Sequence, residues 1–366
     1  MARGTLVSEL RSVAHDAEAL LDYVEAQGWG DGLPVLPPTE ECVQAMLEGT
    51  DLPPSHVVGV VEPRRAEATV EKIAINAVLA GCRPEYLPAV LAAVEAVCDP
   101  LFNLYAINTT TCCATPAVML NGPVRHRLGI ECGYSCLGHN GRANATIGRA
   151  LRLVMRNVGG AIPGAVSKST FGQPGRISLC FGEWEERSPW DPFHARRGFA
   201  ATDDVVTVTC ATGTQDVADI WAETGEELVH LLAHSIDWIG NNKVLVPQEK
   251  GDMLLLLCPD FAHKIARDGL GVSDVQRLLF DATQTPIERW PRGYWPKLEA
   301  RGYAVDGVVP LAASPEQFLI AVAGGEGGHH ALYFCTFGLT WTQSRVIRAP
   351  DDTGGGEFCE LPAQRS

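Results

Sequence analysis

The 366-residue sequence lacks several features that would assign it to a broad functional class. Its longest apolar runs, such as MLLLLC at 253–258, are far too short to cross a bilayer, so we expect no membrane partner. Positive charge is scarce, with 29 basic against 44 acidic residues, and the net charge of -15 argues against a nucleic-acid partner. The first residues, MARGTLVSELRSVAHDAEALL, have no continuous apolar core before a cleavage site. They predict an amphipathic helix and a cytoplasmic protein.

Familiar catalytic signatures are missing too. The sequence contains no G-x-S-x-G elbow, which argues against a serine hydrolase. Its glycine-rich segment VAGGEGGHH (322–330) matches neither a P-loop nor a dinucleotide-binding fingerprint. The chemistry must therefore be sought in other clusters of reactive side chains.

Cysteine, in contrast, is abundant, with twelve residues in the chain. In a reducing cytosol these are expected to be thiols, because disulfide frameworks belong to oxidising compartments. Some follow apolar helix or strand patterns, where a free cysteine behaves as a small hydrophobe. We assign five to the core: Cys82, Cys98, Cys210, Cys258 and Cys335.

Four cysteines fall in one short window that we expect to be catalytic: Cys112, Cys113, Cys132 and Cys136, with His139 just beyond. Adjacent cysteines point in different directions in an extended segment, so at most one of the first pair should face a shared pocket. The second pair together with His139 offers metal ligands, although C-x3-C is a weaker zinc signal than C-x2-C. Zinc, copper or an iron-sulfur centre are the alternatives for such a site.

Cys180 is the first candidate for a nucleophile. It ends the strand-like segment RISLC, and Glu183 follows within the next turn as a group for proton transfer. On this hypothesis Cys180→Ser should keep the fold and lower turnover, whereas Cys210→Ser should lower stability.

Seven further residues are predicted to bind the substrate: Asn108, Asn144, Ser169, Thr170, Gly325, His329 and His330. The asparagine amides would orient a carboxylate or carbonyl, and the hydroxyls lie in the turn STFGQPG (169–175). The glycines around Gly325 let backbone N–H groups approach an anion closely.

The pattern of elements predicts an α/β fold with mixed sheets flanked by helices and a helix-rich N-terminal part. Alanine-rich helices are expected at 68–82 and 84–98. Strands and helices alternate from 204 onward. We expect a helix-rich part over 1–200, an α/β part over 201–350 and a flexible tail over 351–366, or one integrated domain.

The strings GWGDGLPVLPPTEE (28–41), EATVEKIAINAVLAGCRPEYLPAVLAAVEA (67–96), GRANATIGRALRLVMRNVGGAIPG (141–164), STFGQPG and VAGGEGGHH carry a family resemblance. The chain resembles an uncharacterised bacterial family associated with the UGSC group of selenoproteins and their cysteine homologues. The resemblance implies thiol or selenol redox chemistry, and a Cys followed three residues later by Glu, as at Cys180, is typical of it. Longer relatives add a Gly-Ser-Cys domain that is absent here. In that family, small residues or proline are more usual at the positions of Cys112 and Cys113.

The sequence thus predicts a cysteine-dependent enzyme acting on a small molecule, by thiol redox or carbon-sulfur chemistry. It would be an oxidoreductase, lyase or transferase. One alternative is a metal-thiolate protein with a Cys/His-bound metal. Another is a subunit of a redox assembly, as a homo-oligomer or with a separate redox partner.

Overall fold

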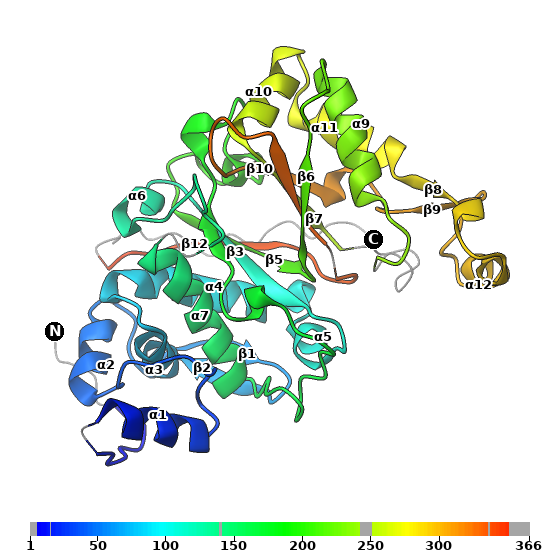
Figure 1. Cartoon of the computed structure of the whole chain (residues 1–366). Helices are drawn as coiled ribbons and strands as arrows, with labels where there is room; N and C mark the ends of the chain where they lie inside the picture. The colour runs from blue at the N-terminus through cyan, green and yellow to red at the C-terminus, as the bar shows by residue number, and fades with distance from the viewer. Residues whose placement is uncertain (1–5, 15, 139–140, 242–250, 336, 351–366) are drawn as a thin grey trace.

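The computed structural model describes residues 6–14, 16–138, 141–241, 251–335 and 337–350 (Figure 1). Its helices are α1 (Ala17–Ala26), α2 (Glu40–Leu47), α3 (Val70–Ala80), α4 (Leu87–Cys98), α5 (Leu104–Thr109), α6 (Val124–Leu128), α7 (Arg142–Asn157), α8 (Phe193–Arg196), α9 (Gly225–Ile236), α10 (Pro259–Arg267), α11 (Val272–Ala282) and α12 (Trp295–Ala300). Its strands are β1 (Val57–Val61), β2 (Ala66–Thr69), β3 (Thr115–Asn121), β4 (Cys180–Gly182), β5 (Val205–Ala211), β6 (Thr214–Ala218), β7 (Met253–Leu257), β8 (Gln284–Pro286), β9 (Val308–Pro310), β10 (Phe318–Val322), β11 (His330–Phe334) and β12 (Gln343–Val346).

Two four-stranded sheets form the centre of the molecule. The first has the order β12-β5-β3-β4, and the second has the order β10-β7-β11-β6. Each sheet is mixed: β3 runs parallel to β4 but antiparallel to β5, while β7 runs parallel to β10 but antiparallel to β11. Mixed sheets flanked by helices confirm the predicted α/β class.

Alternating side chains of the central strands show how the layers stack. Along β7, Leu254 and Leu256 join the apolar cluster that also holds Met119 of β3 and Phe181 of β4. The intervening leucines of β7 pack instead with α9, α10 and α11. Because neighbouring residues of a strand face opposite sides, the two sheets must lie face to face. The rings of Phe181 and Phe334 stack across this interface with centroids 5.9 Å apart.

The outer faces of both sheets are covered by helices, which gives four layers in the order helices, sheet, sheet, helices (Figure 1). Helices α3, α4 and α7 cover the first sheet in the largest apolar cluster. Helices α9, α10 and α11 cover the second. The alanine-rich helices predicted at 68–82 and 84–98 correspond to α3 and α4, and α9, α10 and α11 belong to the alternation predicted after residue 204. No helix within the described ranges combines the length and the apolar character needed to cross a membrane.

The boundary expected near residue 200 does not separate two structural units. Strands β5 and β12 follow this position in the sequence, yet they border β3 in the first sheet. Val206 and Val208 of β5 also belong to the apolar cluster beneath α3, α4 and α7. The first sheet is therefore completed by chain from beyond the predicted boundary. The tail expected at 351–366 lies outside the described residues.

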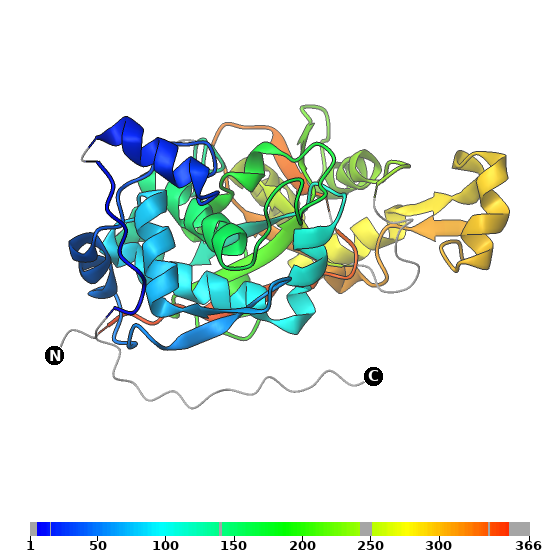
Figure 2. The same ribbon diagram turned by 90° about the horizontal axis from the view of Figure 1, so that it is seen from below.

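A small arm formed by β8, β9 and α12 projects from the body (Figure 2). It has its own apolar cluster, with Trp290, Leu298 and Val309 at its centre. The sequence pattern did not predict this arm, because its strands are only three residues long.

Candidate functional site

A cavity of about 540 Å³ opens beside helix α7. Arg152 and Arg156 line it from the helix, and Arg176 lines it from a short 3-10 turn. Ser167, Ser169 and Gln173 add polar groups. We call this the arginine cavity. Ser169, one of the residues predicted to bind substrate, lines this cavity.

Among the described residues, the three guanidinium groups have neutral hydrogen-bond partners only. Arg152 donates to the carbonyl of Arg176 at 3.1 Å, and Arg156 donates to the carbonyl of Gly28 at 3.2 Å. Arg176 donates to Ser167 Oγ at 2.8 Å. Within the described ranges, no ion pair joins any of the three to a carboxylate. Burial lowers the pKa of Arg152, and the positive charges of Arg176 and Arg156 lower it further.

One carboxylate does line the arginine cavity, but it is already paired. Asp31 accepts two hydrogen bonds from Arg149, at 2.8 Å each, and desolvation of this carboxyl is outweighed by Arg149, so its pKa is lowered. The charges of this pair cancel. The cavity therefore holds three positive charges that an anionic ligand would neutralise.

Helix geometry explains the cluster. Arg149, Arg152 and Arg156 are spaced i, i+3 and i+7, which places them on one face of α7. The apolar residues of the same helix, such as Ile147, Leu151 and Val154, are buried in the largest cluster. Sequence reasoning missed these arginines, although their spacing in a chain of net charge -15 was a usable signal.

A second cavity of about 270 Å³ is lined by three cysteines: Cys112, Cys113 and Cys335. We call it the thiol cavity. Cys113 Sγ donates to the carbonyl of Thr212 at 2.6 Å. The expectation that at most one of the adjacent cysteines faces a shared pocket was wrong, because both line this one. Of the five cysteines assigned to the core, Cys98 and Cys335 are only partly buried and pack at the edge of an apolar cluster. Burial raises the pKa of Cys335 to about 11.

The two cavities share a wall. Gln173, which lines the arginine cavity, donates to the carbonyls of Cys113 at 2.7 Å and Ala211 at 3.0 Å. Thr170 donates from its backbone to Thr111 at 2.9 Å, so its backbone N–H and hydroxyl support this wall. Burial lowers the pKa of Arg176, and the nearby thiols of Cys113 and Cys112 oppose that shift. The two kinds of reactive group are therefore neighbours.

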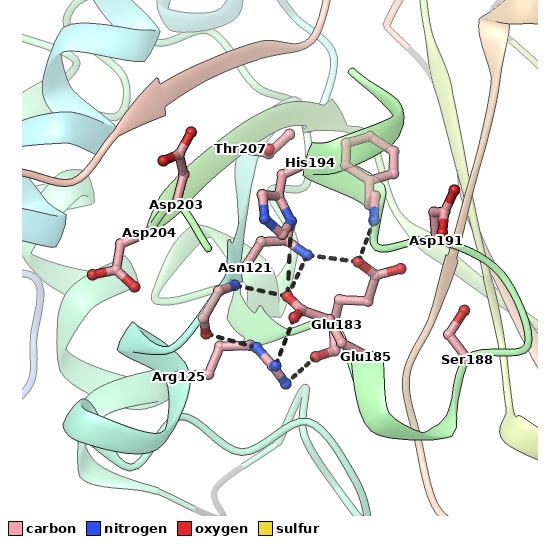
Figure 3. A network of polar contacts seen from close by, with 12 residues as sticks. Asn121, Arg125, Glu183, Glu185, Ser188, Asp191, His194, Asp203, Asp204 and Thr207 are labelled. Carbon is pink, nitrogen blue, oxygen red and sulfur yellow. Dashed lines mark hydrogen bonds and ion pairs between the residues drawn. The ribbon is translucent and has the colours of Figure 1, made fainter. Parts of the chain in front are cut away.

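Glu183 belongs to a different, buried network (Figure 3). Its Oε2 accepts from Asn121 Nδ2 at 2.6 Å and from the Phe193 amide at 2.7 Å. Arg196 lies 3.8 Å from its Oε1. Burial raises the pKa of Glu183 to about 7, despite the opposing charge of Arg196. The side chain of His194 points into the same cluster and is fully buried.

Several atoms of this network have no hydrogen-bond partner among the described residues. They are Glu183 Oε1, Asn121 Oδ1 and both ring nitrogens of His194. Arg125 pairs with Glu185 at 2.8 Å and Glu186 at 2.9 Å beside them. Unpaired buried polar atoms are uncommon and mark a site for water or a functional strain. Glu183 lines neither cavity, however, so a direct role on substrate has no support from its position.

Cys180 occupies a position that does not favour a nucleophile. Strand β4 begins at Cys180, so the prediction that this residue ends a strand was wrong. The side chain is 3% exposed and lies in the apolar cluster with Cys210. Burial raises the pKa of its thiol. Glu183 was expected to be its acid/base partner, but this carboxyl accepts hydrogen bonds from Asn121 and Phe193.

Cys132 and Cys136 are separated from the thiol cavity and form a second buried pair. Burial raises the pKa of each thiol to about 11. Cys132 also lies 3.8 Å from the guanidinium of Arg125. Among the described residues, no group of three or more His, Cys, Asp or Glu side chains is arranged to hold a metal. His139, the third predicted ligand, lies outside the described residues, so the metal site stays a prediction.

The two asparagines predicted to bind substrate are used within the fold. Asn144 accepts from the amide of Glu131 at 2.9 Å and donates to the carbonyls of Glu131 and Cys136 at 3.0 and 3.1 Å. It therefore fastens the loop before α7. Asn108 is buried and donates to the carbonyl of Glu62 at 2.7 Å. Neither asparagine lines either cavity.

The glycine-rich segment contacts side chains of the chain itself. A Cβ at Gly325 would lie 2.2 Å from the ring of Tyr134, so this glycine makes room for an aromatic side chain. The amide of Gly327 donates to Asp260 at 2.9 Å. One amide of this segment is thus bonded to an internal carboxylate, and the anion-binding role of the segment stays a prediction.

The two histidines that follow the glycine-rich segment are both exposed. His330 pairs with Asp216 at 3.0 Å, and the ring of His329 lies 6.3 Å from that of Phe261. Neither lines the arginine cavity or the thiol cavity.

No protein-family model, curated protein or solved structure matches this chain. The resemblance to the UGSC group therefore stays a prediction. Segments that carry it nevertheless meet at one place: Asp31, Arg152 and Ser169 come from three of those strings, and all line the arginine cavity.

Proposed function

We propose that this chain binds a small anionic molecule in the arginine cavity. The observation that carries the proposal is the convergence of Arg152, Arg156 and Arg176 on one cavity, where their hydrogen-bond partners within the described part of the chain are all neutral. Guanidinium groups bind carboxylates and phosphates through paired N–H donors, and they remain charged at any physiological pH. Concentrating three of them at one site is unfavourable unless an anion offsets their mutual repulsion.

The shape of the site supports a ligand of metabolite size. A cavity of about 540 Å³ lies in the range of small-molecule sites, which typically span roughly 300–1,000 Å³. Ser167, Ser169 and Gln173 supply additional hydrogen-bonding groups around the arginines. The arginines would select a ligand by its charge, and the other polar groups would fix its orientation.

Anion binding is tested with inorganic phosphate by calorimetry and thermal unfolding, with sodium chloride added to equal ionic strength. We expect saturable binding to the wild-type protein. Arg152→Gln and Arg176→Gln should each weaken it by about tenfold or more, because each removes a charge-assisted contact. Arg142→Gln is the matched control. Arg142 lies exposed on the same helix and donates to the carbonyl of Gly81 at 2.9 Å.

Two outcomes would contradict the proposal. The first is that phosphate stabilises the protein no more than chloride does at equal ionic strength. The second is that Arg152→Gln and Arg142→Gln change the phosphate affinity equally. The loss of affinity would then come from the net charge of the protein and not from the arginine cavity.

A second candidate function is thiol-dependent catalysis on a small molecule bound in the thiol cavity, as the cysteine content predicts. The observation favouring it is that Cys112 and Cys113 line the thiol cavity on the other side of the shared wall. In this reaction one thiol adds to an electrophilic double bond of the ligand. The carbon-sulfur bond forms, the π bond breaks, and the thiol proton moves to the atom that receives the electron pair, so no oxidant is consumed.

Alkylation of the native protein with iodoacetamide, followed by peptide mapping, tests this second function. An activated thiol at Cys112 or Cys113 should react faster than Cys42, which is an exposed cysteine outside both cavities. Cys113→Ser and Cys112→Ser identify the responsible group. If both cysteines react more slowly than Cys42, thiol catalysis is excluded while anion binding still stands.

A further inference from the structure

Two large apolar side chains lie on the lining of the arginine cavity and are exposed to solvent. Phe171 is 96% exposed and Ile177 is 44% exposed. Scattered exposed apolar residues are ordinary on protein surfaces. Here, however, both line the same concave site as three arginines that form no ion pair with a carboxylate of the described residues. They are therefore placed to contact whatever the arginines bind.

The turn that carries Phe171 is anchored on both sides. Before it, Thr170 donates to the carbonyl of Thr111 through its backbone N–H at 2.9 Å and its hydroxyl at 3.2 Å. After it, the amide of Gly172 donates to Ser169 Oγ at 3.2 Å, and Gln173 is held by the carbonyl of Cys113. Gly172 has φ of +69°, a conformation that L side chains rarely adopt. The aromatic ring is thus held out by a built turn and not by a loose loop.

The rest of the cavity lining also combines charged and apolar residues. Leu153, Ala161 and Pro163 lie on the cavity wall together with the arginines. Of these three, Leu153 and Ala161 are buried and Pro163 is exposed. An inorganic anion would satisfy the guanidinium groups but would leave Pro163 and the Phe171 ring in contact with water. A ligand with an apolar body would cover both.

We propose that the natural ligand of the arginine cavity is an organic anion, with its phosphate or carboxylate between Arg152, Arg156 and Arg176 and its apolar body against Phe171 and Ile177. This inference rests on the anion binding proposed above and adds the class of ligand. The aromatic ring of Phe171 offers a flat face, which suits a planar or aromatic body. The arginines supply the charge recognition, and the apolar rim supplies the discrimination between anions.

The test compares two monoesters that carry the same anionic group, methyl phosphate and phenyl phosphate, by calorimetry at constant ionic strength. Phenyl phosphate should bind about tenfold more tightly or better, because its ring buries additional apolar surface. In Phe171→Ala this advantage should fall below about threefold. Affinity for methyl phosphate, which carries no ring, should fall less than affinity for phenyl phosphate. Trp221→Ala is the control, since Trp221 is 83% exposed and lies outside the cavity lining.

The outcomes separate the two proposals. Equal affinities for the two monoesters, or an undiminished advantage of phenyl phosphate in Phe171→Ala, would overturn the inference and leave anion binding intact. If neither monoester binds, or if Arg152→Gln binds both like the wild-type protein, anion binding itself fails. The substitution of Phe171 should not disturb folding, because almost all of its side chain is in solvent.

Discussion

At the scale of single residues, burial determines what a thiol can do. Cys180 and Cys210 lie in the same apolar cluster, each 3% exposed, and burial raises the pKa of both thiols. We therefore predict that Cys180→Ser and Cys210→Ser each lower the free energy of unfolding by roughly 1–3 kcal/mol, because a hydroxyl replaces an apolar group. Urea unfolding measures this. A Cys180→Ser protein of unchanged stability that fails to convert substrate would restore Cys180 as a nucleophile.

Glu183 should make stability depend on pH. Its pKa rises from 4.5 in the unfolded chain to about 7 when folded, mainly through burial, so the folded state binds its proton more tightly. The stability contributed by this proton is complete below pH 4.5 and is lost as pH rises through 7. A shift of this size corresponds to roughly 3 kcal/mol. Glu183→Gln should remove the decline between these pH values, as measured by denaturant unfolding across the range.

Glu186 provides the matched control for that measurement. Its hydrogen bond with Arg125 lowers its pKa to about 2, so its contribution is present above pH 4.5 and is lost only as pH falls toward 2. Glu186→Gln should therefore leave the slope between pH 5 and 8 unchanged. An equal flattening in both variants would show that the slope does not arise from the buried carboxyl of Glu183.

The residue types of the site were only partly predictable. Cys112, Cys113 and Ser169 were chosen for the chemistry of their side chains, and each lines a cavity. Asn144 was chosen for its amide, but amides bind backbone groups as readily as ligands, and the sequence does not show which partner wins. Arg152 and Arg176 were missed, because arginine usually lies on solvated surfaces and its unpaired state appears only in three dimensions.

At the scale of elements, periodic segments were predicted well and short strands poorly. Helices α3, α4 and α7 have apolar residues at helical spacing, a pattern that is visible in the local sequence. Strands β6 and β12 have mixed polarity and exist because they pair with distant partners, β11 and β5. Strand pairing is a non-local interaction, so a local pattern cannot reveal it.

Gly148 of α7 tests how closely this helix approaches β4. A Cβ at this position would lie 2.5 Å from Ser178 Oγ and 2.9 Å from the amide of Leu179. Helix propensity alone predicts that Gly148→Ala is stabilising by about 1 kcal/mol. We predict the opposite, a loss of roughly 1–3 kcal/mol, because the contact overpacks the interface. Thermal unfolding of the single variant, and partial recovery in the double variant with Ser178→Ala, would check this; a raised melting temperature would refute it.

At the scale of the whole molecule, the arginine cavity is lined by residues that are distant in the sequence and meet only in the folded chain. Asp31, Arg152 and Arg176 line one cavity although long stretches of sequence separate them. Helix α7 carries Arg152. Hydrogen bonds from Thr170 to Thr111 and from Gln173 to Cys113 join the turn at 169–175 to the loop that contains Cys112, and this loop forms the wall between the two cavities. Sequence reasoning identified reactive residues and the α/β class, but it could not bring such segments into contact, because convergence is a property of tertiary structure.

The same integration predicts how the chain behaves when divided. A fragment of residues 1–200 would lack β5 and β12, so β3 would lose the strand with which it makes its longest pairing, from Thr115 to Asn121. The cluster beneath α3, α4 and α7 would also lose Val206 and Val208. We therefore predict that this fragment shows no cooperative thermal transition and little hydrogen-exchange protection in β3, whereas the full chain shows both. A sharp transition in the fragment would instead establish an independent domain ending near residue 200.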